Sequence, residues 1–283
     1  MPLPKRVLGR TGVEVTALGL GGVCWNLRDT DAEAVEVVHR AIDLGITYYD
    51  TAAGYKESER LLGLALQDRD RDGLFLATKY IKRSGEEFRA ELEEGFNRLG
   101  VDVIDLVQLH AIDQDEDLKE VLGPDGALRV MEEYREAGKI RFLGLTGHTH
   151  PERFVRAIRE YDFDVILNPH GAVNRVWNDF AGPILPIARG KGMGVICMKA
   201  MAYGQVPAED VPLYLRFALS QDVDVVIPGM DTVEHVEQNV AIAESFTPLS
   251  PEEEQDALDQ ALAQVESAGT KKLWWLPEER VAA

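Results

Sequence analysis

The chain has 283 residues, of which 45% are hydrophobic and 28% are charged, as is usual for a soluble globular protein. Its two cysteines exclude a disulfide framework, and its net charge of −19 argues against nucleic acid or an anionic membrane as a partner. No segment reaches the roughly 18 apolar residues of a membrane span, and the N-terminus lacks the apolar run of a signal peptide, so we expect a cytoplasmic protein.

The first predicted element is a hairpin over residues 6–16, with two short strands around Gly9–Gly12. Apolar runs then predict eight strands, at residues 16–22, 46–50, 74–79, 101–110, 140–147, 163–168, 194–199 and 224–229. Amphipathic stretches between them predict helices at residues 31–45, 58–68, 86–100, 126–138, 151–161, 181–192, 211–220 and 232–244. Several of these patterns end on a glycine in the manner of a C-cap, as at Gly45, Gly100 and Gly138.

Eight strand–helix units without a break in composition are typical of a (β/α)8 TIM barrel. We predict an α/β fold with one domain over residues 1–283, in which the barrel covers about residues 17–245 and the N-terminal hairpin plugs its floor. A doubly wound open sheet is the competing fold, but no GxGxxG pattern opens a helix after the first strand. Residues 249–283 predict an extra helix, capped by Ser250, and a tail. In this tail Trp274 and Trp275 either pack on the barrel surface or lean over the substrate mouth.

Four polar residues end or follow three consecutive predicted strands, namely Asp50, Tyr55, Lys79 and His110. The carboxyl ends of barrel strands open on one face, so we expect these side chains to meet at one rim. Each alone has an ordinary explanation, as a turn residue, a packed ring, a solvated amine or a core histidine. Together they suit a proton donor, because an ammonium about 4 Å from a phenol stabilises the phenolate by roughly 4 kcal/mol at an effective dielectric near 20. We therefore expect Lys79, held by Asp50, to lower the pKa of Tyr55 toward neutrality.

The segments DTAAGY, ATK and VQLH, in this order and spacing, resemble the catalytic tetrad of the aldo-keto reductases. LGRTGVEVTALGLGG, GKIRFLGLTGHT and IPGMDTVEHVEQN resemble further segments of that family. The resemblance implies a barrel oxidoreductase that transfers hydride between a nicotinamide dinucleotide and an aldehyde, a ketone or a sugar hydroxyl. It also implies that Tyr55 is the general acid, that Lys79 and Asp50 tune it, and that His110 orients the carbonyl.

The resemblance assigns cofactor contacts to several strand ends, which are Gly21, Gly22, Val23, Asp50, Thr146, Gly147, His148, Asn168, Met198, Lys199, Pro228, Gly229, Met230, His235, Gln238 and Asn239. Thr146 and Gly147 stand where the family carries a Ser-Asn pair. A family Gln on the sixth strand matches Leu167, and we choose the adjacent Asn168 for that contact. Met198 replaces the aromatic residue that stacks on the nicotinamide, and Lys199 is expected to neutralise a pyrophosphate.

The identity of the dinucleotide is less clear from the sequence. A lysine and an arginine usually hold the 2′-phosphate of NADPH in this family, but Gly229 and His235 match them, and residues 217–270 contain neither Lys nor Arg. The helix that follows Gly229 still offers backbone donors at its N-terminus. We predict NADPH, from the habit of the family, with NADH as the alternative. The barrel resembles the bacterial branch related to ferredoxin-containing oxidoreductases, but no cysteine follows Cys197, so we expect no iron–sulfur cluster.

Two other functions remain open at this stage. A set of polar residues could form the zinc site of a barrel hydrolase, although we predict no metal; these are His110, His148, His150, His170, Lys79 and Asp50. A non-catalytic dinucleotide-binding regulatory barrel is the other alternative. For the substrate we expect a small carbonyl compound or sugar, contacted by Tyr55 and His110 and by a wall that includes Trp25 and Trp177. The substrate itself, the physiological direction and the oligomeric state are not predicted.

Overall fold

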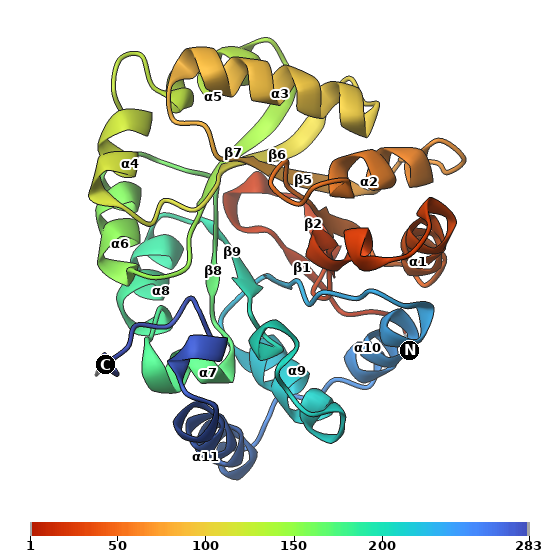
Figure 1. Cartoon of the computed structure of the whole chain (residues 1–283), viewed down its shortest axis with the longest axis vertical. Helices are drawn as coiled ribbons and strands as arrows, with labels where there is room; N and C mark the ends of the chain where they lie inside the picture. The colour runs from red at the N-terminus through yellow and green to blue at the C-terminus, as the bar shows by residue number, and fades with distance from the viewer. Residues whose placement is uncertain (1, 282–283) are drawn as a thin grey trace.

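A computed structural model describes residues 2–281 of the chain as a curled parallel sheet surrounded by helices (Figure 1). The strands of this sheet lie side by side in chain order. They are β3 (Leu20–Gly21), β4 (Tyr48–Asp50), β5 (Phe75–Tyr80), β6 (Ile104–Leu109), β7 (Ile140–Thr146), β8 (Val165–Pro169), β9 (Gly194–Met198) and β10 (Val225–Val226). The predicted (β/α)8 fold is therefore confirmed, with each of the eight expected strands at its expected place.

The first and last strands meet and close the barrel. The backbone N–H of Gly19 donates to the carbonyl of Val226 at 2.9 Å, and that of Gly21 donates to the carbonyl of Pro228 at 3.1 Å. Parallel bridges join Leu18 to Val226 and Gly21 to Gly229 at this seam. Because the sheet closes, the carboxyl ends of all its strands surround one opening, which we call the rim, and their amino ends surround the floor.

The helices follow the strands around the outside (Figure 1). They are α1 (Asp31–Asp43), α2 (Ser58–Leu66), α3 (Gly85–Leu99), α4 (Asp115–Val121), α5 (Ala127–Glu136), α6 (Pro151–Glu160), α7 (Ala172–Trp177), α8 (Ala181–Gly190), α9 (Val211–Ser220), α10 (Val233–Glu244) and α11 (Pro251–Ala268). The short helices α4 and α7, which lie at the rim in the loops after β6 and β8, did not form part of the sequence prediction. The predicted C-caps are confirmed, because the backbone has a positive φ at each glycine: +84° at Gly45, +66° at Gly100 and +72° at Gly138. The side chain of Ser250 caps α11 as expected.

The N-terminal hairpin consists of β1 (Lys5–Val7) and β2 (Glu14–Thr16), which pair antiparallel. Between them Leu8 is fully buried and joins the apolar cluster of the barrel interior, which contains Tyr48, Phe75, Leu106, Val165, Ile196 and Val225. The hairpin therefore plugs the floor of the barrel, as the sequence predicted.

Acidic residues at the starts of β6, β8 and β10 repeat one arrangement at the floor. Asp105 accepts a hydrogen bond from the backbone N–H of Leu76 at 2.9 Å. Asp164 accepts from Leu143 at 2.9 Å, and Asp224 accepts from Val195 at 2.8 Å. In each case the donor lies on the preceding strand of the sheet, so the carboxylate joins two neighbouring strands where they begin. We call these three residues the floor aspartates.

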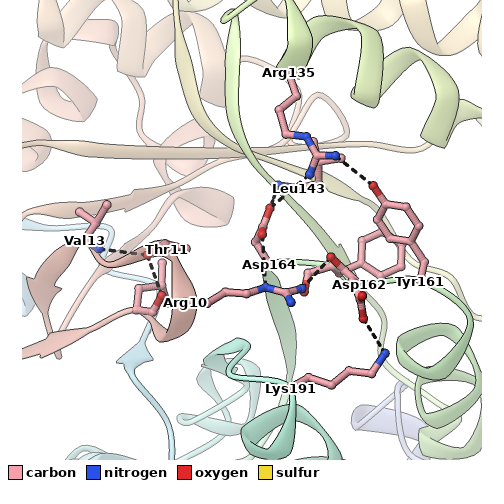
Figure 2. Close-up of polar contacts among 11 residues, drawn as sticks. Arg10, Thr11, Val13, Arg135, Leu143, Tyr161, Asp162, Asp164 and Lys191 are labelled. Atoms are coloured by element: carbon pink, nitrogen blue, oxygen red, sulfur yellow. Dashed lines mark hydrogen bonds and ion pairs between the residues drawn. The ribbon is translucent and has the colours of Figure 1, made fainter.

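Arginines neutralise the floor aspartates, and Figure 2 shows this for Asp164. Arg10 of the hairpin lies 3.4 Å from Asp164, which Arg135 of α5 approaches from the other side at 3.8 Å. Arg71 pairs with Asp105 at 3.2 Å and Arg189 with Asp224 at 3.0 Å. The hairpin plug is thus held by charge as well as by the burial of Leu8.

Among residues 2–281, no helix is both long and apolar enough to cross a membrane.

Candidate active site

Four side chains from neighbouring strands meet at the rim. The Nζ atom of Lys79 donates to a carboxylate oxygen of Asp50 and to the carbonyl of Thr51, the latter at 2.7 Å. The same Nζ atom lies 4.8 Å from the centre of the Tyr55 ring. The rings of Tyr55 and His110 meet edge to face, with their centres 5.7 Å apart. The structure therefore brings together the phenol, ammonium, carboxylate and imidazole that the sequence placed on separate strands.

The turn after β4 explains how Asp50 and Tyr55 reach one place. Parallel pairing continues beyond the strand, because the N–H of Thr51 donates to Ala77 and that of Ala53 donates to Lys79, at 2.8 and 3.1 Å. The N–H of Tyr55 then donates to the carbonyl of Ala52 at 3.0 Å, which closes a turn. Ala52 is fully buried, so a larger side chain would not fit there.

Burial dominates the electrostatics of these groups. Burial raises the pKa of Tyr55, the charge of Lys79 lowers it, and the charge of Asp50 raises it. The net result is a pKa above the ordinary value of 10. This corrects our expectation of a phenol tuned toward neutrality, because the effect of desolvation is larger than that of the ammonium. Burial lowers the pKa of Lys79, but Asp50 and Tyr55 together raise it by more than burial lowers it. The pKa therefore lies above its ordinary value, and the ammonium stays charged. Burial, reinforced by Lys79, holds the pKa of His110 well below 6.5, so this imidazole is neutral at pH 7.

Three further residues support this cluster and were missed by sequence reasoning. Gln108 lies with its amide nitrogen 3.5 Å from Asp50. Arg83 donates to the backbone carbonyls of His110 and Ala111 at 2.8 and 2.7 Å. Asp113 accepts from the backbone N–H of His148 at 2.7 Å and so joins the loop after β6 to the loop after β7. Of these three residues, only Gln108 could have been found from the sequence, because it lies two residues before His110.

Several buried polar atoms at the rim have no hydrogen-bond partner within the described chain. They include the hydroxyl of Thr146 and one ring nitrogen each of His110 and His148. Met198, at the end of β9, belongs to the cluster of the barrel interior and is 8% exposed. A buried polar atom without a partner is costly in a finished structure, so these atoms are suited to a ligand that enters the rim.

The geometry at the end of β8 does not favour Asn168, the residue that we chose as a cofactor contact. Leu167 belongs to the apolar cluster of the barrel interior. Successive side chains of a strand face opposite sides, so Asn168 lies on the side that faces the helices, where its amide donates to the carbonyl of Gly147 at 3.3 Å. His170 is 4% exposed, and burial lowers its pKa to about 4. The geometry does not support Asn168 as a cofactor contact, because strand alternation turns it away from the interior.

Two of the predicted cofactor glycines are required by packing within the protein itself. A Cβ atom at Gly22 would lie 2.7 Å from the carbonyl oxygen of Asp50. A Cβ atom at Gly147 would lie 2.2 Å from the ring of Phe154 in α6. Both glycines therefore have a structural reason that does not depend on a ligand.

The N-terminus of α10 carries a charged cluster from two distant parts of the chain. Arg28, in the loop after β3, lies 3.1 Å from Asp231, and a ring nitrogen of His235 lies 2.7 Å from the same carboxylate. The side chain of Thr232 caps α10. Of the other predicted contacts in this region, Gln238 is exposed, Asn239 is 6% exposed, and Met230 is fully buried in the outer core. The structure thus supplies an arginine beside His235 that the local sequence does not contain.

The four tryptophans have separate positions. Trp25, which we predicted to line the substrate site, is fully buried in the core between the sheet and the helices. Trp177 donates from its indole nitrogen to the carbonyl of Pro277 at 2.9 Å and so anchors the tail. Trp275 is fully buried, whereas Trp274 is 54% exposed and its ring lies 5.2 Å from that of His148. Trp275 therefore packs on the barrel and Trp274 leans over the rim, which are the two positions that the sequence left open for the tail tryptophans.

Of the histidines of the hydrolase alternative, His110 and His148 lie next to each other at the rim, with ring centres 6.4 Å apart. Within residues 2–281, no group of three or more His, Cys, Asp or Glu side chains is placed to hold a metal ion. His150 contacts Glu152 at 3.0 Å on the surface, and His170 lies on the helix-facing side of β8.

Comparisons with known proteins agree with this geometry. The family model described as the aldo/keto reductase family matches residues 17–212. A 6-dehydroglucose reductase from Novosphingobium aromaticivorans is 34% identical over 171 residues, which cover 53% of this chain and 54% of that protein. The match therefore spans about half the length of that relative. An L-galactose dehydrogenase from Arabidopsis thaliana is 28% identical over 88% of this chain and 91% of that protein.

Among solved structures, an aldo-keto reductase from Bacillus halodurans superimposes with a TM-score of 0.76. It is 24% identical in sequence, and the match covers 92% of this chain and 96% of that chain. At this level of identity the likeness shows the fold.

Proposed function

The chain belongs to the aldo/keto reductase family, and we propose that it is an oxidoreductase that transfers hydride between a nicotinamide dinucleotide and a small carbonyl compound or sugar. The observation that carries this proposal is the meeting of Asp50, Tyr55, Lys79 and His110 at the rim. We further propose that residues 1–283 act as one barrel domain.

Each member of the cluster has a role in the proposed reaction. A bound nicotinamide dinucleotide would supply the hydride. Tyr55, which is protonated at neutral pH because its pKa is raised, would donate its proton to the oxygen that becomes an alcohol. Lys79 would stabilise the phenolate that remains, and Asp50 holds Lys79 in position. The neutral imidazole of His110 would donate a hydrogen bond to the carbonyl oxygen and orient it.

Rim residues with unused polar atoms support the proposed dinucleotide site. The buried hydroxyl of Thr146 and the buried ring nitrogen of His148 are free to meet the carboxamide of a nicotinamide. Met198 lies at the top of the barrel interior, where its thioether could contact a ring face. The backbone around Gly21, Pro228 and Gly229 forms the seam of the barrel, which lies next to β9, and the side chain of Val23 lies close to Gly229.

The charges at α10 favour NADH over the NADPH of our sequence-based prediction. Asp231 presents a carboxylate at the N-terminus of this helix, and Glu234 adds a second one in its first turn. A carboxylate accepts hydrogen bonds from a ribose 2′-hydroxyl and repels a 2′-phosphate. Arg28 is the cation that opposes this preference. Its charge offsets that of Asp231, with which it pairs, so the carboxylate of Glu234 is the excess negative charge at this end of the helix.

Binding measurements test the choice of cofactor. We expect the fluorescence of NADH and NADPH to give a Kd for NADH at least about tenfold lower, which corresponds to about 1.4 kcal/mol. In the Asp231→Asn variant the ratio is expected to move toward NADPH, with Glu237→Gln, on the exposed side of α10, as a matched control. Tighter binding of NADPH by the wild-type protein would restore our first prediction.

The names of two relatives support a sugar or a related small carbonyl compound as substrate. One relative is described as a 6-dehydroglucose reductase and the other as an L-galactose dehydrogenase. The rim ends in the rings of Trp274 and Tyr203, of which Trp274 contacts His148. Aromatic faces of this kind pack well against sugar rings and aliphatic chains alike.

The central experiment removes the proposed proton donor. Tyr55→Phe deletes one hydroxyl, so we expect the rate of carbonyl reduction to fall by about 10²–10⁴-fold while the dinucleotide Kd changes little. Steady-state kinetics on a panel of aldehydes and sugars, together with cofactor fluorescence, measure the two quantities separately. A wild-type protein that binds dinucleotide tightly and reduces or oxidises no member of the panel would favour the non-catalytic alternative instead.

A further inference from the structure

Lys199, directly after β9, places its ammonium among three aromatic rings. The Nζ atom lies 4.2 Å from the centre of the Tyr203 ring, 4.6 Å from that of Trp274 and 4.9 Å from that of Trp275. We call these three rings the aromatic cage. Tyr203 comes from the loop after β9 and the tryptophans come from the tail, so the cage exists only when the tail is docked on the barrel.

The cage is held by fixed contacts. The indole nitrogen of Trp275 donates to the side-chain oxygen of Asn174 at 3.0 Å, and Leu273 is buried beside it. The loop after β9 adopts left-handed backbone conformations at residues other than glycine, with φ of +61° at Lys199 and +57° at Tyr203. Such conformations cost free energy and persist only where the surrounding structure holds them, often at functional sites.

A continuous row of rings connects the cage to the proposed proton donor. The ring of Trp274 lies 5.2 Å from that of His148, which lies 6.4 Å from that of His110, and His110 contacts Tyr55. The charge of Lys199 contributes to the lowered pKa of both His110 and His148. Lys199 therefore faces the same opening as the four catalytic candidates.

The ammonium of Lys199 has no partner oxygen among residues 2–281. In contrast to Lys79, it forms no ion pair and no hydrogen bond within this part of the chain. Asp113 is the acidic group that acts on it, but one of its oxygens accepts from the backbone of His148 and Thr149. Burial lowers the pKa of Lys199 to about 7, which reflects a cation that is desolvated without a counter-ion.

From this geometry we propose that Lys199 and the aromatic cage form an anion subsite, which binds a carboxylate or phosphate group of the carbonyl substrate. The proposal rests on the proposed function, because it places the carbonyl of the same molecule at Tyr55 and His110. The chain carries a net charge of −19, so an anionic substrate needs a local cation of this kind. The half-exposed rings of Trp274 and Tyr203 would cover the aliphatic part of that substrate.

Paired substrates of equal length test the proposal. Succinic semialdehyde and butanal differ mainly by one carboxylate, and glyceraldehyde 3-phosphate and glyceraldehyde differ by one phosphate. We expect the wild-type protein to prefer at least one anionic member by about tenfold or more in kcat/KM, as is typical of a charge-assisted hydrogen bond. Which pair shows the preference distinguishes a carboxylate from a phosphate substrate, and equal kcat/KM within both pairs overturns the proposal.

Substitutions at Lys199 test whether this residue is the cause. Lys199→Met keeps the length and removes the charge, so it should abolish the preference, which is read as the ratio of kcat/KM between the two members of a pair. Lys199→Arg keeps the charge and should retain most of the preference. Lys191→Met, at the floor, is the matched control and should behave as wild type. An unchanged preference in Lys199→Met contradicts the proposal.

Two further outcomes separate this inference from other roles. A higher dinucleotide Kd in Lys199→Met, with the substrate preference intact, would assign Lys199 to the cofactor pyrophosphate and overturn the anion subsite. If the wild-type protein reduces no aldehyde, the proposed function fails, and tryptophan fluorescence then tests the subsite directly. Succinate should cause a saturable change in the fluorescence of the wild-type protein and no saturable change in that of Lys199→Met. The absence of a saturable change in the wild type would reject the subsite.

The pH dependence gives an independent readout. Anion binding requires protonated Lys199, so the KM for succinic semialdehyde should be constant below about pH 7 and rise above it, whereas the KM for butanal should not. The other titratable groups facing Lys199 are His110, His148, Asp113 and Tyr203. The pKa of His148 is about 4 and that of His110 lies well below 6.5, so neither imidazole changes charge in this range. Parallel pH profiles for the two substrates would contradict the proposal.

Discussion

The two ends of the barrel treat polar groups in opposite ways. At the floor, Asp105, Asp164 and Asp224 each accept a backbone N–H of the preceding strand and each pair with arginine. At the rim, the hydroxyl of Thr146 and ring nitrogens of His110 and His148 are buried without partners. Both sets of side chains lie at the ends of strands of the same sheet. The difference indicates that the floor stabilises the barrel, while the rim keeps buried polar atoms available for a ligand at the cost of stability.

The largest expected effect comes from the charged pair at the rim. Lys79→Met removes the ammonium beside Tyr55, so the phenolate loses its nearest positive charge. We expect kcat to fall by about 10³-fold, equivalent to about 4 kcal/mol of activation free energy, with little change in dinucleotide Kd. Single-turnover kinetics measure this step.

A double variant separates chemistry from folding in that experiment. Lys79→Met leaves the buried carboxylate of Asp50 without its partner, which destabilises the fold in addition. Lys79→Met/Asp50→Asn removes both charges, and it should recover thermal stability without recovering kcat. Recovery of kcat together with stability would mean that Lys79 acts only on the fold.

The next effect is at the floor and should appear in stability alone. Asp105→Ala leaves the N–H of Leu76 and the arginines Arg71 and Arg141 without their acceptor. We expect a loss of about 2–3 kcal/mol in the free energy of unfolding, or about 3–5 °C in Tm, with kcat unchanged at a temperature where the variant is folded. Thermal denaturation and steady-state kinetics on one preparation measure both. A large drop in kcat with unchanged Tm would remove the distinction between the two ends.

A smaller effect is expected where the hairpin joins the floor. Arg10→Ala removes a hydrogen bond of 2.6 Å to the carbonyl of Asp162 and the ion pair with Asp164 (Figure 2). Because these contacts are only partly buried, we expect a loss of about 1 kcal/mol in unfolding free energy, measured by urea denaturation. Val7→Ala, at an exposed position of the same hairpin, is the control and should change stability by less than about 0.5 kcal/mol.

The smallest effect is expected at the edge of the same network. Lys191 pairs with Asp162 at 2.7 Å, but the carboxylate is largely exposed. Lys191→Ala should therefore cost less than about 0.5 kcal/mol in urea denaturation. A cost as large as that of Arg10→Ala would mean that charge at the floor acts as one network and not through its buried members.

Much of this structure could be predicted from local patterns in the sequence. The strands were found because apolar runs are bounded by turn residues, and the helix ends were found because glycine at Gly45, Gly100 and Gly138 takes a positive φ. Asp50, Tyr55, Lys79 and His110 were found because parallel strands open at one rim, so the end of each strand reports on the site. The helices α4 and α7 were missed because they are short and lie in loops that carry no strong periodicity.

Contacts between distant segments were not available to that reasoning. Arg28 lies 203 positions before Asp231, and Trp275 lies 101 positions after Asn174, so no local pattern links them. The side of β8 that Asn168 faces depends on register, and the burial of Trp25 depends on how its loop folds against the core, so neither could be read from the local sequence.

The sequence by itself determined the barrel, the order of its strands and the four polar residues at the rim, because these follow from periodicity and chain order. The tertiary structure alone decided the pKa of Tyr55, the pairing of the floor aspartates and the cage around Lys199. Each of these depends on burial and on distances between segments far apart in the chain, and desolvation has no signature in a run of neighbouring residues.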